Sequence, residues 1–207
     1  MDQVMVRQTT STQLAALVAA RVCHDLGSPL ASLSALLPQA ADPAAHAVVS
    51  EAAGELRTRL KLFAALFGAC DELTWADVAA LLAGAPMAHR VRFALPAGGA
   101  PLPPGLARLT LAALLLAAEA LPRGGVVHAT PTAPSGLALR CEGRQVDWSP
   151  TLLDLIAGGT IEAALAEGPR RLLAPWVMLL AAEEGQGVSI VLPAGAGEPA
   201  LRIAPLE

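Results

Sequence analysis

The densest cluster of reactive side chains in this sequence is a short polar segment, residues 21–30, inside an otherwise apolar run. His24 directly precedes Asp25 here, and Ser28 directly precedes Pro29. A neutral imidazole carries a free lone pair that can attack an electrophile such as a phosphoryl group. A neighbouring carboxylate can hold the other ring nitrogen, either orienting the ring or accepting its proton. We therefore take His24 and Asp25 as the candidate catalytic pair.

The apolar pattern around this segment predicts a long helix that begins near Thr12. Steps of three and four residues keep one apolar stripe on one helix face, and its members are Val22, Leu26, Leu30, Leu33 and Leu37. At about 100° per residue, His24 lies nearly opposite that stripe and should face solvent. Small side chains around it would let another protein's backbone approach. The predicted partner-docking residues are Arg21, Gly27, Ser28, Ala31 and Ala35.

The sequence predicts a second helix and a helical hairpin. Pro29 should kink the first helix and free a backbone carbonyl near residue 25. Asp42 followed by Pro43 is a helix start, and the second helix should cover about residues 44–69. A short loop makes the two helices antiparallel neighbours over residues 13–71, after a flexible tail over residues 1–12. Two helices cannot close a core, so we expect a homodimer that forms a four-helix bundle.

Residues 72–207 have the pattern of a second, α/β domain with two layers. Short β-like runs are separated by Gly and Pro clusters and cover residues 91–95, 126–130, 137–141, 188–192 and 201–203. Helical runs lie between them at residues 75–83, 106–121, 151–157 and 172–184. We expect the three tryptophans to fill the core of this domain; they are Trp75, Trp148 and Trp176.

Composition excludes several classes of protein. Hydrophobic residues make up 54% and charged residues 15%, which excludes disorder as the main state. Lys and Arg number 14 against 18 Asp and Glu, and no basic cluster exceeds a pair, so we expect no nucleic-acid partner. The longest apolar run, residues 109–118, is shorter than the roughly 20 residues that cross a bilayer, so we expect no membrane span. The 3 cysteines have no metal-site spacing, and we expect reduced thiols in the cytoplasm.

Four stretches carry a resemblance to a known family. The box His24-Asp25-Leu26-x-Ser28-Pro29-Leu30 resembles the phospho-acceptor box of two-component histidine kinases. With residues 63–69, 119–125 and 174–185, the chain resembles the ChpT-type histidine phosphotransferases of alphaproteobacteria over about residues 12–193. The resemblance implies an α+β fold, in which a dimeric helical hairpin is followed by a degenerate histidine-kinase-type (Bergerat-like) ATPase domain. It also implies a phosphorelay, in which His24 takes a phosphoryl group from the Asp of a hybrid kinase's receiver domain and passes it to a response regulator.

We do not expect ATP to bind this chain. Histidine-kinase ATPase domains use an Asn-bearing helix for the Mg²⁺–phosphate unit and an Asp-x-Gly-x-Gly turn for adenine, and this sequence contains neither an Asn nor that turn. The helix in the Asn-bearing place, residues 106–121, leaves Glu119 alone as an oxygen ligand. We expect no cofactor here, and Mg²⁺, a Lys and backbone donors to come from the partner receiver domain.

Several alternatives stay open at this stage. The chain is either a phosphotransfer protein, an ATP-dependent histidine kinase, a non-catalytic dimeric adaptor of a two-component system, or a receiver phosphatase in which Ser28 orients water. A sparse basic set reads foremost as a solvated face, or else as an attraction for a receiver's acidic rim; it comprises Arg21, Arg57, Arg59 and Lys61. Structural or solvated roles are expected for the other histidines, which are His46, His89 and His128.

Overall fold

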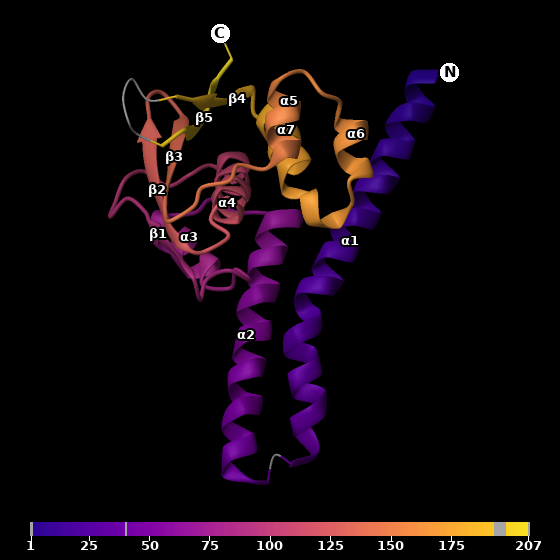
Figure 1. Ribbon diagram of the computed structural model, residues 1–207, viewed down its shortest axis with the longest axis vertical. Helices are drawn as coiled ribbons and strands as arrows, with labels where there is room; N and C mark the ends of the chain where they lie inside the picture. Colours follow the sequence, from indigo (N-terminus) through magenta and orange to yellow (C-terminus); the bar gives the residue numbers. More distant parts are fainter. Residues whose placement is uncertain (1, 40, 193–197, 207) are drawn as a thin grey trace.

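A helical hairpin projects from an α/β unit (Figure 1). The computed structural model describes residues 2–39, 41–192 and 198–206, with the backbone alone for residues 2–10. Helices α1 (Asp2–Leu36) and α2 (Pro43–Phe67) form the hairpin, and the short 3₁₀ helix η1 (Leu37–Gln39) leads into its loop. The predicted tail over residues 1–12 is wrong from residue 2 onward. This polar segment contains no Gly or Pro, the two residues that interrupt a helix most strongly, so polarity alone does not end the helix here.

The start of α2 follows the predicted capping pattern. Asp42 has an extended backbone, its carboxylate accepts a hydrogen bond from the Ala45 N–H, and Pro43 occupies the first turn. In the part of the chain that the structure describes, no helix combines the length and the hydropathy that a membrane span requires.

Pro29 lies inside α1, and the helix continues through it. Because proline has no N–H, the carbonyl of Asp25 loses its helical partner, as the sequence predicts. The guanidinium of Arg59 on α2 takes that place, with its Nη1 donating to the Asp25 carbonyl oxygen at 2.5 Å. Arg59 is 8% exposed, so its assignment to a solvated face is wrong. Its charge enters the helix–helix seam because it finds a free carbonyl there and the carboxylate of Glu55 at the edge.

The second unit contains a five-stranded mixed sheet in the order β1-β2-β3-β5-β4. Strands β1 and β2 run parallel and the other neighbours are antiparallel. All five strands fall at the predicted positions: β1 (Val91–Ala94), β2 (Gly125–Thr132), β3 (Gly136–Glu142), β4 (Gln186–Val191) and β5 (Ala200–Pro205).

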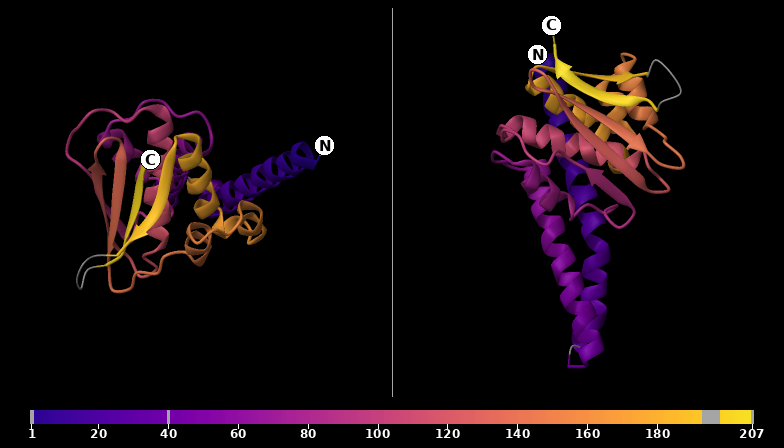
Figure 2. Two further views of the ribbon diagram at one scale, coloured as in Figure 1. Left: turned by 90° about the horizontal axis from the view of Figure 1, so that it is seen from above. Right: turned by 90° about the vertical axis from the view of Figure 1, so that its left-hand side faces the viewer.

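Helices α4 (Pro104–Glu119) and α7 (Leu173–Glu183) cover one face of this sheet (Figure 2). The apolar run of α4 is buried along most of its length between the sheet and α7, which explains its composition. Helices α3 (Trp75–Leu82) and α5 (Pro150–Ile156) match predicted runs. Two short elements were not predicted because each spans barely more than one turn, α6 (Ile161–Ala166) and the 3₁₀ helix η2 (Pro169–Arg171). Both lie beside α1.

The hairpin and the second unit are packed together at a well-defined junction. Trp176 of α7 is half-buried, and its indole N–H donates to the Leu66 carbonyl at 3.2 Å while its ring contacts Phe67. On α3's side, the backbone at Gly84 approaches α2 so closely that a Cβ there would lie 2.4 Å from the Thr58 carbonyl oxygen. Trp75 and Trp148 are buried in the second unit, as predicted, whereas Trp176 serves the junction.

Helix α3 begins with a reciprocal capping box. The Thr74 hydroxyl accepts from the Asp77 N–H at 3.2 Å, and the Asp77 carboxylate accepts from the Thr74 N–H at 2.9 Å and from its hydroxyl at 2.6 Å. These hydrogen bonds hold the pKa of Asp77 below its ordinary value.

The capping box predicts an acid-dependent loss of stability. Because the pKa of Asp77 is lower in the folded protein, its stabilisation is present above the ordinary carboxyl pKa of about 3.9 and is lost as the pH falls through the folded value. We expect Asp77→Asn to lower the urea midpoint at pH 7 and to match the wild type near the acid limit, where Asp77 is itself neutral. A gap between the two proteins that stays constant with pH would contradict this.

The Pro29–Arg59 pairing predicts an energetic coupling between two helices. Arg59→Met leaves the part-buried Asp25 carbonyl without its partner and should cost about 1–3 kcal/mol of unfolding free energy. In a Pro29→Ala background, the new N–H satisfies that carbonyl, and the same substitution should cost at least about 0.5 kcal/mol less. Urea denaturation of the four proteins measures the coupling. Lys61→Met, an exposed cation on the same helix, is the control, and additive effects of the two substitutions would refute the pairing.

Candidate functional site

His24 projects from α1 into solvent, as the sequence predicts. Its side chain is 68% exposed. Four small neighbours on the same helix are exposed as well, and they are Gly27, Ser28, Ala31 and Ala35. No atom lies within 4 Å of the position that a Cβ on Gly27 would take. The ring therefore stands on an open helix face.

Asp25 holds one nitrogen of that ring. Nδ1 of His24 lies 2.9 Å from Oδ1 of Asp25, although adjacent helical residues point about 100° apart. The Asp25 side chain is only 9% exposed. Nε2 of His24 has no hydrogen-bond partner among the described residues. A carboxylate accepts only, so this contact favours the tautomer with the proton on Nδ1 and the lone pair on Nε2.

Arg21 links this pair to the second unit. Its Nε donates to Oδ2 of Asp25 at 2.7 Å, and its Nη2 donates to Oε1 of Glu119 at 2.9 Å. Its Nη1 lies 3.5 Å from the carbonyl oxygens of Pro169 and Arg170. Arg21 is mostly buried, so its assignment to a solvated face is wrong. No local pattern reveals this contact, because Glu119 is 98 residues away in the chain.

Burial and opposite charges set the titration of this ion pair. Burial by itself lowers the pKa of Arg21, but Glu119 and Asp25 stabilise the guanidinium and raise its pKa above the ordinary value. Burial raises the pKa of the Glu119 carboxyl above its usual value, and Arg21 opposes that rise. Arg21 therefore stays charged at any pH where the protein is folded.

A groove of about 300 Å³ runs past His24 at the junction of α1, α4 and η2. Its lining comprises Arg21, His24, Asp25, Glu119, Pro169 and Arg170. Arg170 lines the groove and Arg171 is its neighbour in η2; both are exposed, and within the described ranges neither lies within ion-pair distance of a carboxylate. The groove therefore places an exposed imidazole near an exposed guanidinium, which suits an incoming anionic group.

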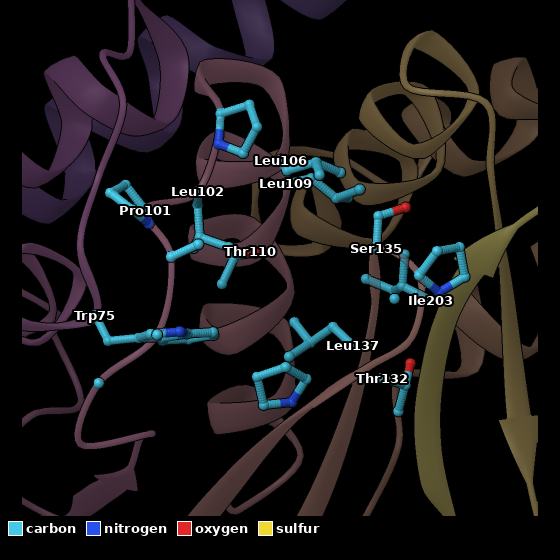
Figure 3. Close-up of a pocket in the computed structure, with 17 residues that line it drawn as sticks. Trp75, Pro101, Leu102, Leu106, Leu109, Thr110, Thr132, Ser135, Leu137 and Ile203 are labelled. Carbon is cyan, nitrogen blue, oxygen red and sulfur yellow. The ribbon is translucent and has the colours of Figure 1, made fainter.

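A larger cavity of about 390 Å³ lies elsewhere, between the N-terminal half of α4 and the turn joining β2 to β3 (Figure 3). Trp75, Leu109, Leu137 and Ile203 stand around it. None of its lining residues is charged, so it offers no cation for a triphosphate. Leu106 at this cavity is 13 residues from Glu119 along α4, which is roughly 20 Å at 1.5 Å per residue.

The remaining histidines lie apart from this site. Nε2 of His128 contacts the Glu142 carboxylate of the neighbouring strand at 3.0 Å, and Nδ1 of His89 contacts the Pro86 carbonyl at 3.1 Å. His46 is exposed on α2. Across residues 2–39, 41–192 and 198–206, no group of three or more His, Cys, Asp and Glu is arranged to hold a metal ion.

Solved structures place this geometry among known folds. A structure described as a bacterial phosphotransferase, solved at 1.7 Å, aligns over 92% of this chain and 95% of its own, with 25% identity and a TM-score of 0.71. The histidine kinase domain of the blue-light activated kinase EL346 from Erythrobacter litoralis aligns over 87% of this chain and 96% of its own, with 17% identity and a TM-score of 0.43. No curated protein matches the chain.

The family model described as the histidine phosphotransferase C-terminal domain matches residues 75–195, which is more than half of the chain. Both the predicted α+β fold class and the predicted family are confirmed, and the match lies in the second unit while His24 lies in the hairpin. The chain thus belongs to the histidine phosphotransferase family, and its role is in phosphoryl transfer.

Proposed function

We propose that this chain is a phosphorelay intermediate that carries a phosphoryl group on His24 from one receiver domain to another. The observation that carries the proposal is the exposed imidazole, whose Nδ1 is held by Asp25 and whose Nε2 is unpartnered among the described residues. A nucleophile that must meet two different proteins has to be exposed. A ring that must attack through one nitrogen has to have its other nitrogen held.

The transfer step balances with the groups at this site. The Nε2 lone pair forms a bond to phosphorus while the bond between phosphorus and the donor's aspartyl oxygen breaks, and the donor leaves as a carboxylate. The proton stays on Nδ1, so the ring becomes cationic as the N–P bond forms. Asp25 neutralises that charge at 2.9 Å. The reverse step, with the carboxylate of a second receiver as nucleophile, delivers the phosphoryl group onward.

The partner would supply the rest of the machinery. A Mg²⁺ ion bound to the receiver neutralises charge on the phosphoryl oxygens, and the receiver's Lys and backbone donors assist it. This chain would contribute the exposed Arg170, which lines the groove, and its exposed neighbour Arg171, because positive charge attracts the acidic pocket of a receiver. The exposed small residues beside His24 would let the receiver's backbone come close; they are Gly27, Ser28, Ala31 and Ala35.

An ATP-dependent kinase is the weaker alternative. Glu119, the single acidic residue of α4, is already committed to Arg21. The sequence has no Asn to help hold a Mg²⁺–phosphate unit. We therefore propose that the phosphoryl group arrives from another protein. We also propose a cytoplasmic location, the usual compartment of receiver domains, with which the three free cysteines agree.

We further propose that the hairpin pairs with a second copy of this chain to form a four-helix bundle. Leu37 is 62% exposed near the hairpin tip, and Leu30, Val48 and Leu60 are also well exposed. The Arg59–Asp25 contact places Leu60 level with His24, so these side chains extend along the hairpin. Such a length of exposed apolar surface on both helices favours burial against an identical hairpin.

The phosphorelay proposal predicts the outcome of a transfer assay. With a radiolabelled receiver from the same organism as donor, His24→Ala should abolish labelling, because the other carboxylate-bound imidazole among the described residues, that of His128, lies on the sheet away from the groove and has its Nε2 held by Glu142. His46→Ala, an exposed histidine on the same hairpin, is the matched control and should label normally. Labelled ATP with Mg²⁺ should label neither protein. Undiminished labelling of His24→Ala would disprove the proposal.

The homodimer proposal predicts the outcome of a mass measurement. Light scattering at micromolar concentration should give a dimer for the wild type and a monomer for the double variant Leu30→Glu with Leu37→Glu, because charges would then have to be buried in the new interface. Leu153→Glu, an equally exposed leucine on α5, should remain dimeric. A monomeric wild type, or equal dissociation of the control, would rule out this interface.

A further inference from the structure

We propose that Glu119 of the second unit is a positioning residue for His24 and acts through Arg21 and Asp25. In this role Glu119 fixes Arg21, Arg21 fixes the carboxylate of Asp25, and that carboxylate keeps the proton of His24 on Nδ1. The inference rests on the proposed function of His24 as the nucleophile. It assigns to α4 a part in phosphoryl transfer that needs no nucleotide.

An unbroken series of short contacts joins Glu119 to His24. Glu119 Oε1 to Arg21 Nη2 is 2.9 Å, Arg21 Nε to Asp25 Oδ2 is 2.7 Å, and Asp25 Oδ1 to His24 Nδ1 is 2.9 Å. Each link uses a different atom of its side chain, so no donor or acceptor is shared. The two interior members, Arg21 and Asp25, are mostly buried, while His24 is open to solvent. The His24 ring can therefore move only as far as its hydrogen bond to the mostly buried Asp25 allows.

The sign of the charge alternates along this series of contacts. An imidazole that becomes cationic during transfer faces the negative Asp25, which faces the positive Arg21, which faces the negative Glu119. Without Glu119, the full guanidinium charge would act on Asp25 and weaken its hold on the developing imidazolium. Glu119 offsets that charge and leaves Asp25 available to the ring.

Contacts other than that of Glu119 already hold the hairpin and the second unit together. Trp176 already joins α7 to α2 through its hydrogen bond to Leu66 and its contact with Phe67. Glu119 instead places a carboxylate, 25% exposed, at the end of a buried, apolar helix, where partial burial raises the pKa of the carboxyl and disfavours its charged form. The ion pair between Glu119 and Arg21 is therefore better explained by its effect on Arg21 than by a role in holding the two units together.

The orientation of His24 depends on how the second unit is docked against the hairpin. The reactive geometry of His24 in the hairpin depends on a residue of the second unit, and the carbonyls of Pro169 and Arg170 in η2 also approach Arg21. The nucleophile is therefore fully oriented only while α4 and η2 are docked against α1.

The test measures transfer rate against receiver concentration for Glu119→Ala and Glu119→Gln. We expect the rate constant at saturating phosphorylated receiver to fall by about tenfold or more for Ala and by less for Gln, which keeps an acceptor oxygen. The half-saturating receiver concentration should stay within about twofold, since Glu119 acts on the chemical step. Glu183→Gln is the control, because it removes the carboxylate charge from another ion pair of α4, the 3.1 Å contact between Arg108 of α4 and Glu183 of α7.

A second readout needs no partner. The ring ¹⁵N shifts of His24 report which nitrogen carries the proton, and we expect Nδ1–H to dominate in the wild type and Nε2–H to gain population in Glu119→Ala. Wild-type rates and tautomer in both Glu119 variants, or a raised half-saturation with an unchanged saturated rate, would overturn the inference. The His24→Ala assay separates the two ideas. If that variant still accepts label, the proposed function fails, whereas normal Glu119 variants with inactive His24→Ala refute the positioning role alone.

Discussion

One guanidinium, that of Arg21, sets the geometry on which the rest of the site depends. Its planar fork reaches carboxylates on two separate elements, Asp25 on its own helix and Glu119 on α4. Arginine suits this position because its donors lie in fixed directions and its charge persists when buried. A buried guanidinium between two carboxylates is tolerated only if all three groups stay paired. The hairpin and the second unit are therefore held in one mutual arrangement beside His24.

A defect in helix α1 supports the same site from the other side. Pro29 removes one backbone hydrogen bond, and Arg59 replaces it from α2 at the carbonyl of Asp25 itself. Both ends of this residue are thus restrained, its carbonyl by Arg59 and its carboxylate by Arg21. His24, one residue earlier, is left free on the outside. Rigid support beneath an exposed ring suits the proposed role, in which this protein orients the imidazole and a partner would supply the metal and the charge stabilisation.

The second unit has a layered α/β architecture, and the carboxylate of its helix α4 bonds to Arg21 of the hairpin. Its α4 is an almost wholly apolar helix whose one carboxylate contacts the hairpin. Its cavity of about 390 Å³ is lined by no charged residue and lies roughly 20 Å along α4 from that carboxylate. A fold of this kind can persist because its core is set by apolar burial, and its polar positions are free to change role.

From the sequence we predicted the five strands that the described residues form, the helical hairpin and the outward direction of His24, and we identified Asp25 as a residue able to hold the ring. These follow from periodicity and from neighbours in the chain, which local physics decides. The sequence did not determine the fate of Arg21 and Arg59, which composition placed on a solvated face and the structure buries. A charged side chain is buried only where a hydrogen-bonding or oppositely charged group lies beside it. For Arg21 that group is a carboxylate 98 residues away, and for Arg59 it is a carbonyl on the facing helix. Tertiary packing alone brings those groups together, so the support beneath His24 could not be predicted from neighbouring residues in the chain.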